Sequence, residues 1–75
     1  QVEAVTEEKL SKKKGLKYFL RAVTRWKEGC YTTRTTGVQG SGVLKSMALA
    51  NSLIILPEEA ENIKKGDRVA VRFLS

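Results

Sequence analysis

The chain is a small basic protein of 75 residues, long enough for one domain that buries roughly 60% of the surface its unfolded form exposes. Its 14 basic and 8 acidic residues give a net charge of +6, which can attract phosphates, nucleic acid or an acidic partner. Because it has no histidine and a single cysteine, Cys30, the composition excludes an internal disulfide and a histidine- or cysteine-based metal site, and favours a reducing, cytoplasmic setting.

The N-terminal part of the chain is predicted to form strands joined by polar turns. Residues 1–10 begin as QVEAV and predict a polar edge strand, although the EEKL stretch also suits a helix. The only basic run, Lys12–Lys14, precedes Gly15 and is expected in a solvated turn. Residues 17–27 alternate, which predicts a strand with a more apolar face turned mainly inward and two apolar side chains of the other face covered by a neighbour. The inward face comprises Tyr18, Leu20, Ala22, Thr24 and Trp26, and the covered pair is Phe19 and Val23.

A hairpin and a glycine loop follow. Glu28 and Gly29 predict the hairpin turn, and the threonine-rich residues 30–36 predict its return strand. The stretch GVQGSG, residues 37–42, predicts a loop whose Ser41 caps a short apolar helix over residues 43–50. Asn51 suits the left-handed C-terminal cap of that helix.

The C-terminal part returns to strands. Leu53 to Leu56 form a continuous apolar run that predicts a buried strand, and Pro57 ends it. Residues 58–65 predict a polar connection with one helical turn, anchored by Ile63, before a turn at Gly66 and Asp67 and a final strand over residues 69–74. The whole is a single, mostly β domain over residues 1–75. No apolar run approaches the ~20 residues of a membrane span, and no signal peptide is visible.

The glycine loop is the best candidate for chemistry. Free N–H groups at the start of a helix suit an anion, although a tight strand-to-helix turn without a ligand explains the same glycines. The loop is not a P-loop, because Lys45 comes too late, and the GxGxxG fingerprint is absent. The acidic residues are scattered, and no Ser-His or Cys-His pair exists, so we do not expect this chain alone to be catalytic.

Three stretches, in order, resemble the C-terminal domain of the molybdopterin molybdenumtransferase family, which includes bacterial MoeA and the E domain of gephyrin. TTGVQGSG, followed by an apolar segment ending in Ala-Asn and by LIILP, is similar to the family's Thr/Pro-x-Gly-x-Gln-Gly-Ser pattern and the segments after it. GLKYFLRAV resembles its Gly-Arg-x-Glu/Asp-Phe-x-Arg segment, and residues 63–71 resemble its closing strand. Leu16 and Tyr18 replace the family's arginine and acidic residue, so the roles of those two residues cannot be carried over.

The resemblance implies a β-clip-like, mostly antiparallel barrel or sandwich that forms one domain of a longer enzyme. Because the chain begins with Gln1, we expect a fragment or a processed product. The family's full-length proteins take adenylylated molybdopterin and molybdate, hydrolyse the adenylate in a magnesium-dependent step and release molybdenum cofactor as dimers. Their magnesium-binding acids lie mainly in a preceding domain, so no cofactor is expected in the isolated domain, and Mg²⁺ and molybdate are implied for the full-length protein.

Arg21 and Ser41 are the site residues that the resemblance implies, with Gln39, Gly40 and Gly42 completing the anion-binding loop. Arg21 would offer a permanent charge and a forked donor to a phosphate or other oxyanion; an ordinary exposed strand arginine is the alternative. Leu56 and Pro57 map to a region where gephyrin relatives bind a receptor peptide. The alternative is that Pro57 serves only to end the strand.

Two other functions fit the sequence. One is a non-catalytic module that binds a protein or peptide near Pro57. The other is a small basic nucleic-acid-binding domain, which requires aromatic residues interleaved with the basic ones. Because Tyr18, Phe19 and Trp26 are predicted to belong to the strand core, we do not expect nucleic acid to be the natural partner.

Overall fold

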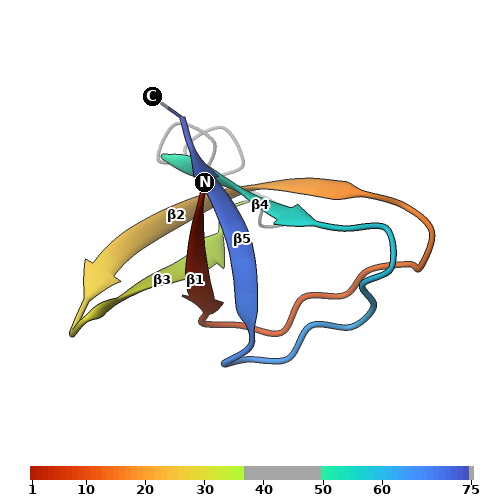
Figure 1. The fold of residues 1–75 in the computed structure, drawn as a ribbon, viewed down its shortest axis with the longest axis horizontal. Coiled ribbons are helices and arrows are strands. Elements are labelled where there is room, and N and C mark those ends of the chain that lie inside the picture. Colours follow the sequence, from red (N-terminus) through yellow and green to blue (C-terminus); the bar gives the residue numbers. More distant parts are fainter. Residues whose placement is uncertain (37–49, 75) are drawn as a thin grey trace.

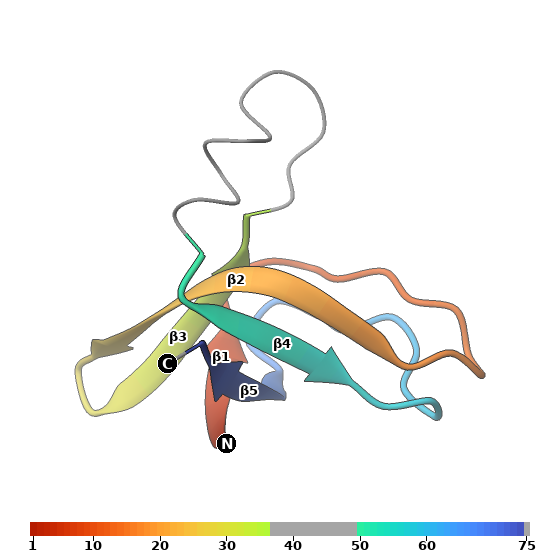
Figure 2. The ribbon, with the colours of Figure 1, turned by 90° about the horizontal axis from the view of Figure 1, so that it is seen from above.

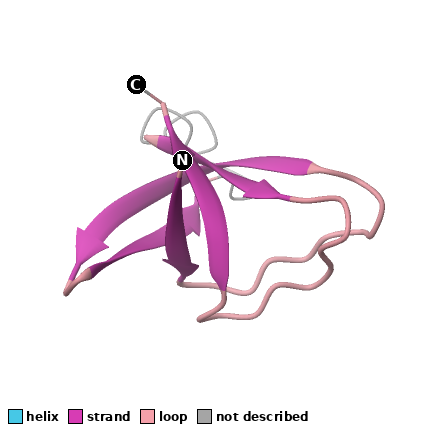
Figure 3. Ribbon diagram, viewed as in Figure 1, coloured by secondary structure: helices cyan, strands magenta, loops and turns pink. Residues whose placement is uncertain are grey.

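The computed structural model describes residues 1–36 and 50–74, which form a small barrel of five strands. The strands are β1 (Val2–Thr6), β2 (Tyr18–Lys27), β3 (Cys30–Thr35), β4 (Ser52–Leu56) and β5 (Arg68–Phe73). Figure 1 shows them wrapped around one interior, and Figure 3 shows that the rest of the described chain is loop or turn. The mostly β fold is therefore confirmed. The helix predicted over residues 43–50 lies almost wholly outside the described residues.

The sheet closes on itself in the order β1-β3-β2-β4-β5. Four of the strand pairs are antiparallel, whereas β1 and β3 run parallel. The architecture is thus a mostly antiparallel barrel rather than a sandwich. Closure gives each of the five described strands a partner on both sides over part of its length, which shortens the free edges that could pair with another chain.

The N-terminal strand was predicted at an edge of the sheet and instead lies between β3 and β5. Ala4 of β1 pairs with Tyr31 on one side and with Val69 on the other. Ala4 and Thr6 are buried, while Glu3 is exposed, so successive side chains of β1 point alternately into the barrel and outward. A polar outer face looks the same in an edge strand and in a barrel strand, which explains the wrong prediction; the helical alternative for residues 1–10 is also wrong.

The inward face predicted for β2 is confirmed as far as Thr24. Ala22 and Thr24 are buried, and Tyr18 and Leu20 pack half-buried against the core. The core itself combines small and branched apolar side chains from β1, β2, β4, β5 and the first long connection. Its members are Ala4, Leu10, Ala22, Ile54, Leu56, Val69 and Val71.

Two aromatic residues of β2 lie outside this core, contrary to the prediction. Trp26 is 65% exposed, because β2 pairs with β4 only as far as Ala22 and continues beyond it with β3 as a two-stranded ribbon. Its ring meets Tyr31 edge-on at 5.0 Å between centroids. Phe19 is 57% exposed, because no described segment covers the outer face of β2 there, while Val23 is half-buried as expected.

The turn between β2 and β3 is formed by the two predicted residues. Glu28 has a φ of 48° and Gly29 a φ of 90°. Positive φ at both central residues is typical of the type I′ turn, whose twist matches that of the flanking strands. The hairpin prediction is therefore confirmed in its strands and in its turn.

Two long connections, residues 7–17 and 57–67, run side by side below the barrel (Figures 1 and 2). Leu10 and Ile63 exchange two backbone hydrogen bonds of 2.8 Å, and the amide of Gly15 donates to the carbonyl of Glu58 at 2.8 Å. Ile63 also packs against the core, as its isolated position in a polar stretch predicts. Pro57 ends β4 and begins a turn in which the Ala60 amide donates to its carbonyl at 3.1 Å.

Lys12, in the first of these connections, is buried, contrary to the prediction. It was predicted in a solvated turn, yet it is only 7% exposed. Its Nζ donates to the carbonyls of Lys13, Glu58 and Ala60 at 2.8, 3.1 and 2.9 Å, and lies 5.4 Å from the ring centroid of Tyr18. The reason is that these carbonyls belong to loops and have no strand partner, so a cation that satisfies three at once is well placed beneath them.

Candidate functional site

The segment that carries the glycine loop leaves and rejoins the barrel at one place on β2. The amide of Thr36 donates to the carbonyl of Arg21, and the amide of Asn51 donates to the carbonyl of Ala22, both at 3.0 Å. Figure 2 shows β3 and β4 on either side of β2 at this end of the barrel. Both ends of the segment 37–49 are therefore held at the step between Arg21 and Ala22.

Asn51 holds one of these ends through its side chain. Its Oδ1 accepts from the amide of Thr24 at 2.9 Å, and its Nδ2 donates to the Thr24 carbonyl at 3.0 Å. The side-chain amide thus continues the β4–β2 ladder, whose last backbone pair is Ser52 with Ala22. Asn51 is not the left-handed cap that the sequence predicts, because Glu28 is the one non-glycine residue with positive φ in the described ranges.

A chain of hydroxyl groups crosses the barrel interior beneath the same end. Thr24 Oγ1 lies 2.9 Å from Thr33 Oγ1 and 2.7 Å from Ser52 Oγ, and Ser52 Oγ donates to the Ala22 carbonyl at 3.0 Å or to Asn51 Oδ1 at 2.9 Å. Because the single Ser52 proton goes to one of these acceptors, Thr24 donates to Ser52 and Thr33 donates to Thr24. This directional network fixes three strands, and threonine-rich strand patterns alone did not reveal it.

Glu8 holds the other end of the segment. Its Oε2 accepts from the amide of Thr35 at 2.6 Å and from the Thr35 hydroxyl at 2.9 Å. Charge-assisted bonds of this kind are shorter and stronger than neutral ones. One oxygen of the Glu8 carboxylate is therefore bonded twice to β3.

Beside this clamp lies a hollow of about 350 Å³, hereafter the Arg21 hollow. Its lining residues are Glu8, Lys9, Leu10, Ser11, Leu20, Arg21 and Thr35. Arg21 and Lys9 are exposed, and the one ion pair among the described residues is elsewhere, between Arg68 and Glu3 at 3.5 Å. The segment 37–49 contains no acidic residue. Two cations without an ion-pair partner in the described chain, one with a planar fork, can hold a phosphate or another oxyanion here.

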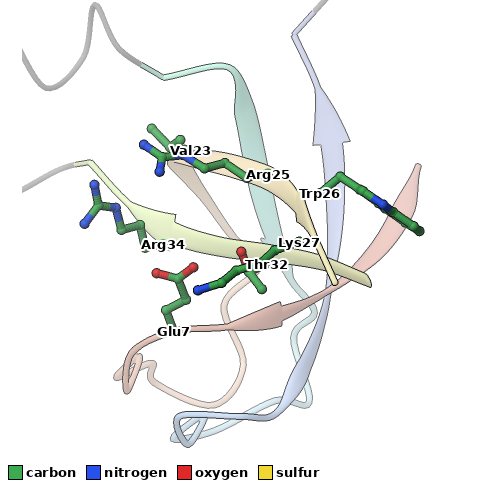
Figure 4. Close-up of a pocket in the computed structure, with 7 residues that line it drawn as sticks. All are labelled: Glu7, Val23, Arg25, Trp26, Lys27, Thr32 and Arg34. Atoms are coloured by element: carbon green, nitrogen blue, oxygen red, sulfur yellow. The ribbon is translucent and has the colours of Figure 1, made fainter. Parts of the chain in front are cut away.

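A second cationic surface lies on the outer side of the β2–β3 hairpin, hereafter the basic hairpin face. Its hollow of about 290 Å³ is lined by Glu7, Val23, Arg25, Trp26, Lys27, Thr32 and Arg34. Figure 4 shows the side chains of Arg25, Lys27 and Arg34 on one side of the hairpin together with Glu7, while the indole of Trp26 points away from them. The sequence predicts part of this face, because the alternation of β2 places Arg21 and Arg25 on the same side. The position of Arg34 across from Val23 follows only from the strand register.

The other predicted site residues have different outcomes. Ser41, Gln39, Gly40 and Gly42 lie outside the described residues. Leu56 is 1% exposed and belongs to the core, so in the pair proposed for partner binding only Pro57 has an accessible side chain.

Among the described residues, neither a cluster of metal-ligand side chains nor a membrane-spanning helix is found. No three side chains of the ligand types His, Cys, Asp and Glu come together in residues 1–36 and 50–74. Nor do these ranges hold a helix long and apolar enough to cross a membrane.

Comparison with known proteins agrees with the barrel and with the resemblance in the sequence. The family model described as the MoeA C-terminal region (domain IV) matches residues 3–74. The chain belongs to this family. The Arg21 hollow and the basic hairpin face of this chain therefore lie within its match to domain IV.

Solved structures of MoeA-type proteins share the domain IV fold. The chain is similar to the molybdopterin biosynthesis moeA protein from Pyrococcus horikoshii OT3, with a TM-score of 0.69 and 22% identity over 96% of this chain and 18% of that one. It is also similar to a molybdenum cofactor biosynthesis protein from Pyrococcus furiosus, with a TM-score of 0.65 and 27% identity over 93% of this chain and 24% of that one. The chain therefore spans about a fifth of the length of these proteins. No curated protein sequence matches it significantly.

Proposed function

We propose that this chain acts as the C-terminal domain of a molybdenum cofactor biosynthesis enzyme that inserts molybdate into adenylylated molybdopterin. In this proposal the domain forms part of the active-site cleft of a longer, homodimeric protein, and the preceding domains supply the magnesium-binding acids. The isolated 75-residue domain is not catalytic. The family membership and the solved MoeA-type relatives support the proposal.

The observation that carries the proposal is that both ends of the glycine-loop segment are hydrogen-bonded to β2 at Arg21 and Ala22. Arg21 is exposed at that point, beside a hollow that also contains Lys9. The Asn51 amide and the hydroxyl network fix the strand that carries Arg21, so its guanidinium fork can bind an oxyanion with little loss of backbone freedom. Ser41, in the loop between the two fixed ends, would add its hydroxyl to the same anion.

The substrate chemistry fits these residues. Adenylylated molybdopterin carries phosphate groups and molybdate is itself an oxyanion, so either would be attracted to Arg21 and Lys9. Such charge-assisted hydrogen bonds contribute about 1.5–3 kcal/mol each, and about 1.4 kcal/mol corresponds to a factor of ten in rate or affinity. The chain's own residues would bind and orient the anion. In this proposal the metal-dependent step belongs to the other domains.

The test is molybdenum cofactor formation by the full-length protein. Arg21→Ala and Ser41→Ala are each expected to lower it about ten- to a hundredfold, with the thermal melt little changed. Arg21→Lys keeps the charge but not the fork and should recover only part of the activity. Arg68→Ala is the matched control. Arg68 lies outside the Arg21 hollow, and its exposed ion pair with Glu3 contributes little to stability.

Each result has a distinct meaning. Full activity in both the Arg21 and Ser41 variants would refute the anion site. Lost activity together with a collapsed melt in Ser41→Ala would show that the serine is only a structural cap. Magnesium-dependent hydrolysis of the adenylate by the isolated chain would contradict the proposal that the preceding domains supply the magnesium-binding acids.

A further inference from the structure

The basic hairpin face is built from positions that the strand register brings together. Val23 is paired with Arg34 and Arg25 with Thr32 across β2 and β3, so Arg25 and Arg34 are diagonal neighbours on the outer face. Long side chains at such positions lie within reach of a common ligand. Lys27 continues the same face toward the turn, and all three cations are exposed (Figure 4).

These three cations have no acidic partner in the part of the chain that the structure describes. Glu7 lines the same hollow, yet none of its oxygens comes within ion-pair distance of Arg25, Lys27 or Arg34. A surface that keeps three positive charges unpaired raises the local concentration of anionic partners and accelerates their association. The hollow of this face and the Arg21 hollow share no lining residue, although Arg21 lies on the same face of β2 as Arg25.

We propose that the basic hairpin face is a docking surface for an acidic polypeptide segment of another protein. Two features favour a polypeptide over nucleic acid. The single aromatic side chain of the hollow, Trp26, turns away from the cations (Figure 4), so no ring is offered to a base among them. Val23 gives the centre of the hollow a half-buried apolar surface, which suits an aliphatic side chain.

The barrel also dictates how such a segment binds. Beyond Ala22, β2 pairs with β3 alone, and the backbone of Thr24 is bonded by the Asn51 side chain, so the free edge of this strand is short and begins after Thr24. Because Arg25, Lys27 and Arg34 line the hollow on the outer face, a segment that contacts all three lies on that face, and its carboxylates are recognised by these side chains. The forked guanidinium groups favour bidentate contacts with single carboxylates.

The experiment uses the natural full-length protein and a fluorescein-labelled peptide of alternating glutamate and alanine residues, followed by fluorescence anisotropy. The double variant Arg25→Glu/Arg34→Glu is expected to weaken binding about tenfold or more. The control Lys64→Glu/Lys65→Glu makes the same change in net charge on exposed residues of the 57–67 connection, and should weaken binding less than about twofold. Arg25→Gln/Arg34→Gln provides a milder variant in case charge reversal prevents folding, which a thermal melt would reveal.

A labelled oligothymidylate, measured in parallel, tests the rival partner. The proposal is supported if the peptide binds, if the hairpin variants lose that binding, and if the control keeps it. Equal loss in both charge-reversed variants would overturn it in favour of general attraction by net charge. Tighter binding of the oligonucleotide through Arg25 and Arg34 would overturn it in favour of nucleic acid, and the absence of any peptide binding would also refute it.

Discussion

Lys12 provides the sharpest test of how this barrel is held together, because its ammonium group joins two connections between strands. The replacement Lys12→Met keeps most of the side-chain volume and removes hydrogen bonds of 2.8, 3.1 and 2.9 Å to three carbonyls. Hydrogen bonds to charged groups contribute about 1.5–3 kcal/mol each. Glu58 and Lys13 are themselves exposed, so water replaces part of what is lost, and the expected loss in the free energy of unfolding is about 2–3 kcal/mol in total.

This loss is large for a chain of 75 residues. At about 4–8 °C per kcal/mol, the melting temperature should fall by about 10–20 °C. Urea unfolding and a thermal melt of the chain measure both quantities. Lys14→Met is the control, because Lys14 is exposed and its replacement should change the free energy of unfolding by less than about 0.5 kcal/mol. If Lys12→Met proved as stable as this control, the idea that the buried ammonium joins the two connections would be refuted.

Three further changes test the hydroxyl network, the asparagine bridge and the hairpin turn, each by urea unfolding. Thr24→Val should cost about 1–2 kcal/mol, because it leaves the buried Thr33 hydroxyl without its partner; a neutral result would contradict a stabilising role of the network. Asn51→Ala should cost about 2 kcal/mol, since it removes two bonds to the Thr24 backbone, and an effect no larger than that of a surface substitution would argue against this bridge. Glu28→Asn should stabilise the chain by about 0.5–1 kcal/mol, because asparagine tolerates the φ of 48° better than glutamate; destabilisation would show that the turn is not of type I′.

Much of the barrel follows from local patterns in the sequence. Alternation predicts β2, the pair Glu28-Gly29 predicts the turn into β3, and Pro57 predicts where β4 ends; each is confirmed. The motif around the glycine loop indicates the family, which the match over residues 3–74 confirms. These features are readable because each depends on residues a few positions apart, through side-chain direction along a strand or the allowed φ of a turn.

The candidate site was predictable only in part. Arg21 was singled out by its resemblance to the family's Phe-x-Arg segment, and the structure brings it to the fixed ends of the segment that holds Ser41. Lys9 was not predicted, because it belongs to an irregular connection whose course no periodicity describes. The basic hairpin face was predictable in part. The alternation of β2 places Arg25 and Lys27 on one side, but it does not show that Arg34 of β3 lies beside them.

The sequence by itself determined which segments become strands, which way most of their side chains point, and the family to which the chain belongs. Tertiary structure alone decided that β1 has two neighbours, that Trp26 extends beyond the barrel, that Lys12 is buried and that Asn51 bridges to β2. The physical reason is that these outcomes depend on which distant segment supplies a partner. A polar strand becomes central only when the sheet closes, and a lysine is buried only where carbonyls from another loop converge on it.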